Sequence, residues 1–331
     1  MEQTRAKIID KYFNAGKRLV LSDPVYKQWV MRYTFLELEK DLGENGDITT
    51  DCLKIDKRIY KARVYANSLG TMAGGDEIEY FLDKSDPNLR PRLGHIKIIS
   101  KQKDGEEFLK DDMILEIEGD IHDILKSERV VLNFLQHMCG IATKTKQIIE
   151  KAHTANSKIL ICPTRKTTWG LLDKKAVYLG GGGTHRLSLS DAVLIKDNHE
   201  ALFENDLKKL LENFNLPKTE YAFFEIEMQN PEQIVENAEY LKNLQAERKL
   251  PVPVVIMFDN IKPEIIENII IELKKNDFYD NFLFEASGGI NEKNITDYAK
   301  TGVDVISMGS LTQKLEPLDL SLEIGKPSSS I

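Results

Sequence analysis

Apolar and charged residues alternate with helical spacing between Thr4 and Lys40, which predicts two amphipathic helices. Residues 58–66 (RIYKARVYA) alternate with a period of two, as a half-buried strand does, and further β-rich runs follow at 95–100 and 113–117. The polar stretch Asp47–Thr50 is predicted to be a loop. The first third of the chain is therefore predicted to form a small α+β unit.

A different pattern begins near residue 127, where a mostly apolar helical stretch leads into repeated alternation of strands and helices. Six apolar runs each end abruptly in polar or glycine residues, at 158–166, 192–198, 222–228, 252–260, 281–289 and 303–310. Near-continuous apolar runs of this kind are typical of parallel strands that are covered on both faces. Amphipathic helices are predicted between the later runs, at 231–248, 263–275 and 291–301.

These units predict an α/β protein, an open α/β (TIM-like) barrel with an N-terminal α+β sandwich domain. The expected domains are 1–127 for the sandwich and 128–312 for the barrel, with residues 313–331 as a tail that packs on the sandwich. A doubly wound sheet is the alternative. Polar residues at the ends of several strands favour the barrel, and no G-x-G-x-x-G motif follows a strand.

The charge of the chain limits the kinds of partner that it can bind. A formal net charge of -8 argues against general binding of nucleic acid or of an anionic membrane, so any anion site must be local. Cys52, Cys139 and Cys162 form no C-x-x-C motif, which favours a reducing, cytoplasmic setting over a disulfide framework. No apolar run approaches the roughly 18 residues that a membrane span needs.

Basic residues gather where the first two predicted barrel strands end. Arg165 and Lys166 close one strand, Lys196 closes the next, and a run of four glycines before His185 and Arg186 lies between them. A single lysine or arginine is usually a solvated surface cation. Five basic groups beside a glycine loop instead predict an anion site, because arginine pairs in a bidentate way with carboxylate or phosphate.

The later predicted strands bring carboxylates to the same edge. Glu225 and Glu227 are two residues apart and share one face of their strand, while Asp259 and Glu285 lie near the ends of the following strands. A metal ion, a substrate with hydroxyl groups, or pairing with Lys166 and Lys196 would each compensate these charges.

Two glycine-containing turns follow neighbouring strands. Ser287, Gly288 and Gly289 end one strand, and Gly309 and Ser310 end the next. Either turn alone is a weak signal, but two on adjacent strands resemble a barrel phosphate site, where backbone N–H groups bind the anion. A phosphoribosyl donor together with an aromatic acid would suit the basic, acidic and glycine regions at once.

The ordered motifs resemble those of the quinolinate phosphoribosyltransferase family. The resemblance rests on 164–168 (TRKTT), 185–186 (HR), 191–199 (DAVLIKDNH), 259–260 (DN), 285–289 (EASGG) and 301–304 (TGVD), with 46–50 (GDITT) and 128–135 nearer the N-terminus. It implies a Mg²⁺-dependent reaction of quinolinate with phosphoribosyl pyrophosphate, which gives nicotinate mononucleotide, pyrophosphate and CO₂ in NAD biosynthesis. It also implies a homodimer or higher homo-oligomer in which Arg129 reaches the neighbouring subunit's site.

The same resemblance implies roles for individual residues. Substrate binding falls to Arg129, Arg165, Lys166, His185, Arg186, Lys196, Ser287, Gly288, Gly289, Gly309 and Ser310, with the 5′-phosphate at the last five and the pyrophosphate near Lys166. Glu227 and Asp259 correspond to the acids beside the ribose and the metal, and Lys166, Glu227 and Asp259 form the catalytic set. Trp169 departs from the pattern, because the family usually has proline there, and the stretch from Arg165 to His185 is shorter than usual.

Three other functions remain open at this stage. The nearest is a phosphoribosyltransferase for nicotinate or another aromatic acid, which would need fewer cations than a dicarboxylate does. A barrel lyase would use Lys166 or Lys196 as a Schiff base. A carrier domain over residues 103–117 would need an exposed Met-Lys hairpin, which the sequence does not contain.

Overall fold

The computed structural model describes residues 2–83 and 93–327, which form two compact units, each discontinuous in sequence. Unit 1 contains residues 1–15, 147–166 and 182–310, and unit 2 contains residues 16–146, 167–181 and 311–331. The sequence instead predicts a sandwich over 1–127, a barrel over 128–312 and a tail over 313–331, and the first of these borders lies at residue 127. Helix α6 (Ile121–His153) runs through that position without interruption, so the change of sequence pattern there does not mark a structural border.

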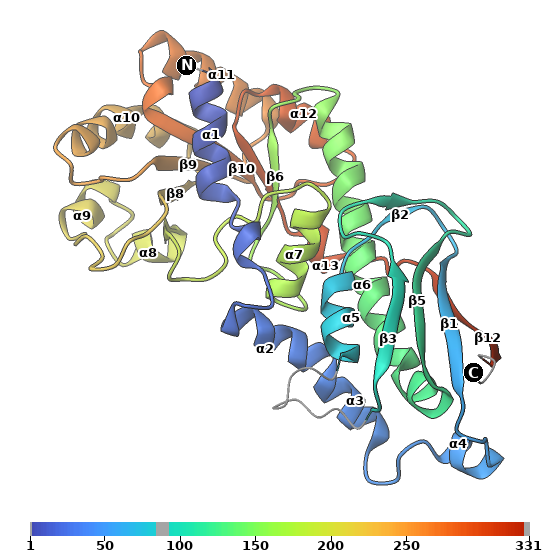
Figure 1. Cartoon of the computed structure of the whole chain (residues 1–331). Helices are drawn as coiled ribbons and strands as arrows, with labels where there is room; N and C mark the ends of the chain where they lie inside the picture. Colours follow the sequence, from blue (N-terminus) through green and yellow to red (C-terminus); the bar gives the residue numbers. More distant parts are fainter. Residues whose placement is uncertain (1, 84–92, 328–331) are drawn as a thin grey trace. The chain divides into compact units, whose positions relative to one another are not determined.

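Unit 1 is built on a six-stranded parallel sheet with the order β6-β11-β10-β9-β8-β7 (Figure 1). Each of the six predicted runs supplies one strand: β6 (Leu160–Pro163), β7 (Val193–Ile195), β8 (Phe224–Met228), β9 (Val254–Asp259), β10 (Phe282–Ser287) and β11 (Val305–Met308). Within the described chain, β6 and β7 are not paired with each other, so the sheet is open and no closed barrel forms.

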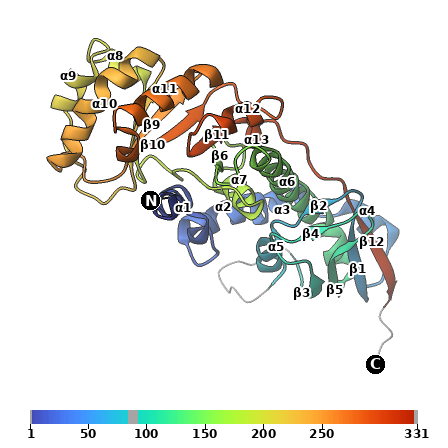
Figure 2. The same ribbon diagram turned by 90° about the horizontal axis from the view of Figure 1, so that it is seen from above.

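Helices follow the strands of this sheet, and three of them stand at the predicted places: α10 (Pro231–Ala246), α11 (Pro263–Lys275) and α12 (Ile295–Lys300). Two short helices after β7, α8 (Asp197–Ala201) and α9 (Leu207–Glu212), are not predicted from the sequence. Pro231 and Pro263 stand in the first turns of α10 and α11, where the missing backbone N–H removes no hydrogen bond of the helix. Figure 2 shows α10, α11 and α12 along the strands on the side away from α1 (Glu2–Phe13).

Helix α1 packs on the other face of the sheet of unit 1. Ile9 and Phe13 are buried in one apolar cluster with residues from the six strand regions, namely Cys162, Ala192, Phe223, Val255, Leu283 and Val305. Arg5 anchors the same helix, since its Nε and Nη2 donate to the two Asp304 oxygens at 2.6 and 2.7 Å. The first helix therefore belongs to the parallel sheet of unit 1 rather than to the predicted N-terminal domain.

Unit 2 combines an antiparallel sheet with several helices. Its antiparallel sheet has the order β12-β1-β5-β3, with β1 (Ile59–Ala66), β3 (Ile96–Lys101), β5 (Met113–Asp120) and β12 (Leu320–Pro327), and β2 (Gly70–Thr71) pairs with β4 (Glu107–Phe108). The C-terminal strand β12 pairs with β1 over Tyr60 to Ala66. The end of the chain thus completes a sheet that begins some 260 residues earlier along the sequence.

The helices of unit 2 are α2 (Pro24–Tyr33), α3 (Phe35–Leu42), α4 (Ile48–Leu53), α5 (Gly75–Leu82), α6 and α7 (Leu171–Leu179), with a short 3-10 turn at Gly16–Arg18. The prediction of a loop over Asp47–Thr50 is wrong, because α4 begins at Ile48. The Asp47 carboxylate accepts from Thr50 N at 3.1 Å and so caps the helix. Among the described helices, none has the length and apolar character needed to span a membrane.

Candidate functional site

Alternation along the parallel strands of unit 1 directs every second side chain to the face that α1 covers. Along the strands toward their carboxyl ends, the apolar layer of that face is followed by Glu225 on β8 and Glu285 on β10. The next side chains on the same face are Glu227, Asp259 and Ser287. The register places Ser287 directly beside Asp259. The polar residues predicted at the strand ends therefore share one edge of one sheet.

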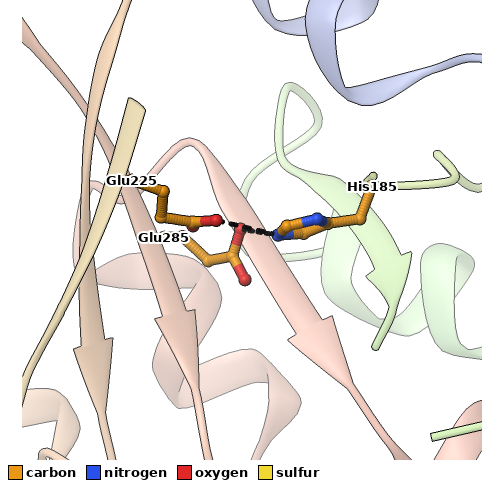
Figure 3. Close-up of side chains that lie close together, drawn as sticks. All are labelled: His185, Glu225 and Glu285. Carbon is orange, nitrogen blue, oxygen red and sulfur yellow. Dashed lines mark ion pairs between the residues drawn. The ribbon is translucent and has the colours of Figure 1, made fainter. Parts of the chain in front are cut away.

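His185 is buried between Glu225 and Glu285 (Figure 3). Its Nε2 lies 3.1 Å from a Glu285 oxygen and 3.4 Å from a Glu225 oxygen, and both carboxylates are fully buried. Phe13 and Phe223 meet the imidazole edge to face at 5.3 and 5.5 Å between ring centroids. One histidine thus compensates two carboxylates inside an apolar surrounding.

The three groups shift one another's pKa values. Burial alone would lower the pKa of His185, but the charges of Glu285 and Glu225 raise it to about 9. Burial and the charge of Glu285 raise the pKa of Glu225 to about 7, against the opposing effect of His185. Burial also acts against ionisation of Glu285, but His185 keeps the pKa of that carboxyl below its ordinary value. Of the two carboxyls, Glu285 is therefore the one that ionises more readily, and Glu225 keeps its proton to a higher pH.

His185 also holds the loop that carries Arg186. Its backbone has a φ of +52°, its N–H donates to Phe13 O at 2.9 Å, and its Nδ1 accepts from Arg186 N at 2.7 Å. Both ring nitrogens are consequently engaged inside the protein. The substrate contact predicted for His185 stays a prediction, and the geometry gives this residue a positioning role for Arg186.

Two glycines of the run before His185, Gly180 and Gly183, pack closely against the protein itself. A Cβ on Gly183 would lie 2.7 Å from Cys162 Sγ and 3.0 Å from Phe13 O, and a Cβ on Gly180 would lie 2.4 Å from Ala142 O. The sequence suggests close approach to a ligand instead. At these two positions the neighbour is the protein backbone or core.

Three of the predicted cations line one cavity of about 450 Å³ in unit 1. Arg165, Arg186 and Lys196 contribute to its wall, together with Tyr221 and His199. Arg186 is buried, and Nη1 donates to Ala192 O at 3.2 Å. Burial, followed by the nearby charge of Arg165, lowers the pKa of Arg186. This volume suits a small molecule, and the wall favours an anion.

Acidic residues stand beside this cavity at the strand ends. Lys196 Nζ donates to Glu227 at 2.8 Å, so one cation links the cavity to the acidic side. On the next strand, an Asp259 oxygen accepts from Asn260 Nδ2 at 2.8 Å and from Gln229 Nε2 at 3.3 Å. Glu227 and Asp259 are both only partly buried, which leaves oxygen atoms available to a ligand.

The turn after β10 contains two glycines in the left-handed region of backbone conformation. Gly288 and Gly289 have φ values of +83° and +65°, and a Cβ on Gly288 would lie 2.4 Å from Asn260 Oδ1. Only glycine tolerates both constraints. Ser307 Oγ donates to Ser287 Oγ at 2.9 Å and fixes the first hydroxyl of this turn. Gly309 and Ser310 follow the adjacent strand β11.

Two further predicted residues have exposed side chains. Lys166 is exposed after β6, and its N–H donates to Thr164 Oγ1 at 3.2 Å. Arg129 belongs to unit 2, lies on α6, and has a side chain that is 60% exposed. An exposed arginine is available to another subunit, so its predicted role stays open. The sequence predicts Glu225 from its i, i+2 spacing to Glu227 and Glu285 from its place near a strand end, but it does not predict that His185 is their partner.

Known proteins resemble this chain in both sequence and architecture. The model of the quinolinate phosphoribosyl transferase C-terminal domain matches residues 141–323, and the model of the N-terminal domain matches residues 47–139. The chain belongs to the quinolinate phosphoribosyltransferase family. The family model for the C-terminal domain starts inside α6, in agreement with a helix that contributes to both units.

Similar members of the quinolinate phosphoribosyltransferase family come from distant organisms. A protein of Methanocaldococcus jannaschii named probable nicotinate-nucleotide pyrophosphorylase (carboxylating) is 38% identical over 90% of this chain and 98% of its own length. Quinolinate phosphoribosyltransferase (decarboxylating) 1 of Nicotiana glauca is 33% identical over 94% of this chain and 87% of its own. The crystal structure of NadC from Streptococcus pyogenes is 28% identical, with a TM-score of 0.74 over 91% of this chain and 98% of that one.

Proposed function

We propose that this protein transfers the phosphoribosyl group of phosphoribosyl pyrophosphate to quinolinate with loss of CO₂, a step of NAD biosynthesis. The products are nicotinate mononucleotide, pyrophosphate and CO₂. The observation that carries the proposal is the cavity of about 450 Å³ whose wall includes Arg165, Arg186 and Lys196. A dicarboxylate needs several cations in a small space, and this cavity supplies three of them.

The quinolinate carboxylates would pair with Arg165, Arg186 and Lys196, with Arg129 of a neighbouring subunit as the fourth cation. His185 would contribute through Arg186, whose backbone N–H it accepts at 2.7 Å. The 5′-phosphate would bind at Ser287, Gly288 and Gly289 together with Gly309 and Ser310. These turns offer backbone N–H groups and hydroxyls at the ends of two paired strands.

The acidic residues suit a Mg²⁺ ion that is shared with the substrate. Glu227 and Asp259 supply carboxylate oxygens, which are the ligands that Mg²⁺ prefers, and this ion is commonly held by one or two carboxylates plus substrate phosphates. When bound, Mg²⁺ would neutralise charge on the leaving pyrophosphate. Lys166 would stand on the pyrophosphate side as a further positive charge.

The reaction then needs little beyond binding and electrostatics. Glu227 and Asp259 would stabilise the positive charge that develops at ribose C1 as its bond to pyrophosphate breaks and the bond to the pyridine nitrogen forms. The bond from C2 to its carboxylate breaks next. The electron pair stays at C2, where the pyridinium nitrogen stabilises it until a proton from water replaces CO₂.

We place this chemistry at the carboxyl edge of an open α/β barrel, in a cytoplasmic homo-oligomer. The strand ends gather the polar residues at one edge, which is where barrel enzymes position their active sites. The three cysteines form no metal or disulfide motif, which suits a reducing compartment.

The purified protein is expected to release CO₂ from quinolinate when it is supplied with phosphoribosyl pyrophosphate and Mg²⁺. Arg186→Ala should raise KM for quinolinate by about tenfold to a hundredfold, because a charge-assisted pair to a buried guanidinium contributes about 1.5–3 kcal/mol. Arg248→Ala, which removes an exposed arginine of the same unit, serves as the control and should leave KM unchanged.

Nicotinate is the competing acceptor to include in the same assay. It has one carboxylate and would leave part of the cation set without a partner. Turnover of nicotinate with no release of CO₂ from quinolinate would refute the proposed reaction and favour a transferase for monocarboxylic acids.

A further inference from the structure

His199 shares a cavity with three of the predicted cations. The wall of the cavity of about 450 Å³ includes Arg165, Arg186, Lys196 and His199, all of which belong to unit 1. His199 is exposed and lies in the first turn of α8, three residues after Lys196. The predicted substrate set contains the three cations and His185, but not this imidazole.

Two hydrogen bonds hold His199 against the backbone of Lys196. Nδ1 of His199 accepts from Lys196 N at 3.0 Å, and the backbone N–H of His199 donates to Lys196 O at 2.8 Å. The side chain of Lys196 is itself held, because its Nζ donates to Glu227 at 2.8 Å. The imidazole and the ammonium group are therefore carried by the same short, hydrogen-bonded turn.

The bond to Nδ1 also determines which ring nitrogen of His199 carries the proton. A nitrogen that accepts a hydrogen bond offers its lone pair, so the single proton of the neutral imidazole is on Nε2. Among the residues that the structure describes, none accepts a hydrogen bond from this Nε2–H. The neutral ring thus has one N–H donor left for a ligand, on the side away from its own backbone.

His185, the histidine of the predicted substrate set, has both ring nitrogens engaged inside the protein. Its Nδ1 accepts from Arg186 N at 2.7 Å, and its Nε2 lies 3.1 Å from an oxygen of Glu285 and 3.4 Å from an oxygen of Glu225. Of these two histidines, His199 is therefore the one that can offer a donor to a small molecule in the cavity.

We propose that His199 is a substrate-binding residue whose Nε2–H donates a hydrogen bond to a carboxylate of quinolinate. The proposal rests on the proposed function, in which Arg165, Arg186 and Lys196 pair with the two carboxylates. Two carboxylates offer about eight acceptor positions, so three cations leave room for a further donor. A neutral donor can meet one of these positions without adding to the repulsion among the cations.

The kinetic test compares His199→Asn with His199→Gln, because each variant keeps one of the two functions of the imidazole. The Asn amide oxygen can replace Nδ1 as the acceptor from Lys196 N, but the shorter side chain has no group at the position of Nε2. The Gln amide N–H₂ reaches the position of Nε2 and supplies a donor there. His199→Asn should raise KM for quinolinate by about tenfold, whereas His199→Gln should stay within about threefold of wild type. KM for phosphoribosyl pyrophosphate should change little in either variant.

His95→Asn is the matched control, because His95 is an exposed histidine that does not line the cavity. It should leave both KM values unchanged, and all assays are run below the melting temperature of each variant. A larger rise in KM for quinolinate in His199→Gln than in His199→Asn would overturn the proposal, since the acceptor for Lys196 N would then be the function that matters. An unchanged KM for quinolinate in His199→Asn, or a rise in KM for phosphoribosyl pyrophosphate alone, would overturn it as well.

Nuclear magnetic resonance of the imidazole nitrogens gives a readout that needs no turnover. The chain contains six histidines, and the signals that are missing in His199→Asn assign those of His199. The free protein should show the Nε2–H tautomer at His199, and titration with quinolinate should shift its Nε2 signal with the Kd measured by calorimetry. The Nδ1–H tautomer in the free protein, or a constant Nε2 signal during saturable binding, would contradict the proposal.

The wild-type protein separates failure of this proposal from failure of the proposed function. If wild type neither binds nor converts quinolinate, the proposed function itself fails. If wild type does both and His199→Asn has the same KM and Kd for quinolinate, only the role of His199 fails.

Discussion

At the scale of single residues, the two glutamates beside His185 are expected to behave oppositely. The pKa of Glu225 is raised to about 7, so the folded protein holds a proton there that the unfolded chain has lost. A raised acid pKa means that stability falls as pH rises from about 4.5 to 7. Glu285, with its lowered pKa, is stabilised by its charge and should contribute stability above about pH 4.5.

Glu225→Gln should therefore stabilise the protein at pH 8, by about 1–3 kcal/mol, because it removes the cost of ionising a buried carboxyl. At pH 5, where Glu225 is largely protonated, the variant and wild type should differ little. Glu285→Gln is the matched comparison and should destabilise the protein at both pH values, since it leaves His185 without its ionised partner. Urea unfolding at pH 5 and pH 8 measures all three, and equal shifts for the two variants would contradict this assignment.

Particular residues show how far the sequence predicts the site. Spacing alone placed Glu225 with Glu227, and the strand ends placed Arg165, Lys196, Asp259 and Ser287 at one edge. The contact of His185 with Glu225 and Glu285 was not predictable. It depends on the φ of +52° at His185 and on the fold bringing together two glutamates that are 60 residues apart in sequence. A local pattern predicts the face of a strand or helix on which a residue lies. The contacts that the residue makes on that face depend on tertiary packing.

At the scale of elements, the parallel strands were the most predictable part. All six apolar runs form strands, because strands buried on both faces leave a strong, continuous signal. The sequence predicts that α1 is amphipathic, but it does not predict the sheet on which α1 packs. Its buried residues Ile9 and Phe13 pack on strands that lie from about 150 to about 290 residues further along the chain, and periodicity carries no information about such partners.

The anchoring of α1 provides a test at this scale. Arg5 makes a two-fold contact with Asp304, donates to Phe282 O at 2.7 Å, and stacks over the Tyr279 ring at 4.3 Å. Arg5→Leu should lower the free energy of unfolding by about 3 kcal/mol, because it leaves the buried Asp304 without its counter-charge. Lys7→Ala, on the exposed face of the same helix, should change it by less than about 0.5 kcal/mol.

Guanidinium chloride unfolding distinguishes these variants. A double variant, Arg5→Leu with Asp304→Asn, should recover part of the loss, since it removes the uncompensated charge. If Arg5→Leu and Lys7→Ala have the same effect, the ion pair with Asp304 contributes no more to the docking of α1 than an exposed charge does.

At the scale of the whole molecule, a net charge of -8 coexists with a cation-lined cavity, so the preference for anions is local. The chain also crosses between its two units several times, whereas the sequence predicts only the two borders after residues 127 and 312. One consequence concerns assembly. Arg129 lies in unit 2 with an exposed side chain, whereas Arg165, Lys166 and Arg186 all belong to unit 1.

If Arg129 serves a neighbouring subunit's site, two inactive variants should restore activity to each other. Arg129→Ala and Lys166→Ala should each lose most turnover when assembled alone. Co-expression with different affinity tags gives hybrids in which one site combines an intact Lys166 with the partner's intact Arg129. Random pairing in a two-fold dimer makes half of the assemblies hybrid, so about a quarter of wild-type activity should return. Purification through both tags in succession should raise this to about half, because every remaining dimer then has one complete site.

Arg186→Ala combined with Lys166→Ala is the control. Both substitutions then affect residues of unit 1, and a hybrid with either change in each of its sites should have no more activity than the parent variants together. Activity that remains at the sum of the parent variants in the Arg129 and Lys166 hybrid would show that Arg129 acts in its own subunit or in neither.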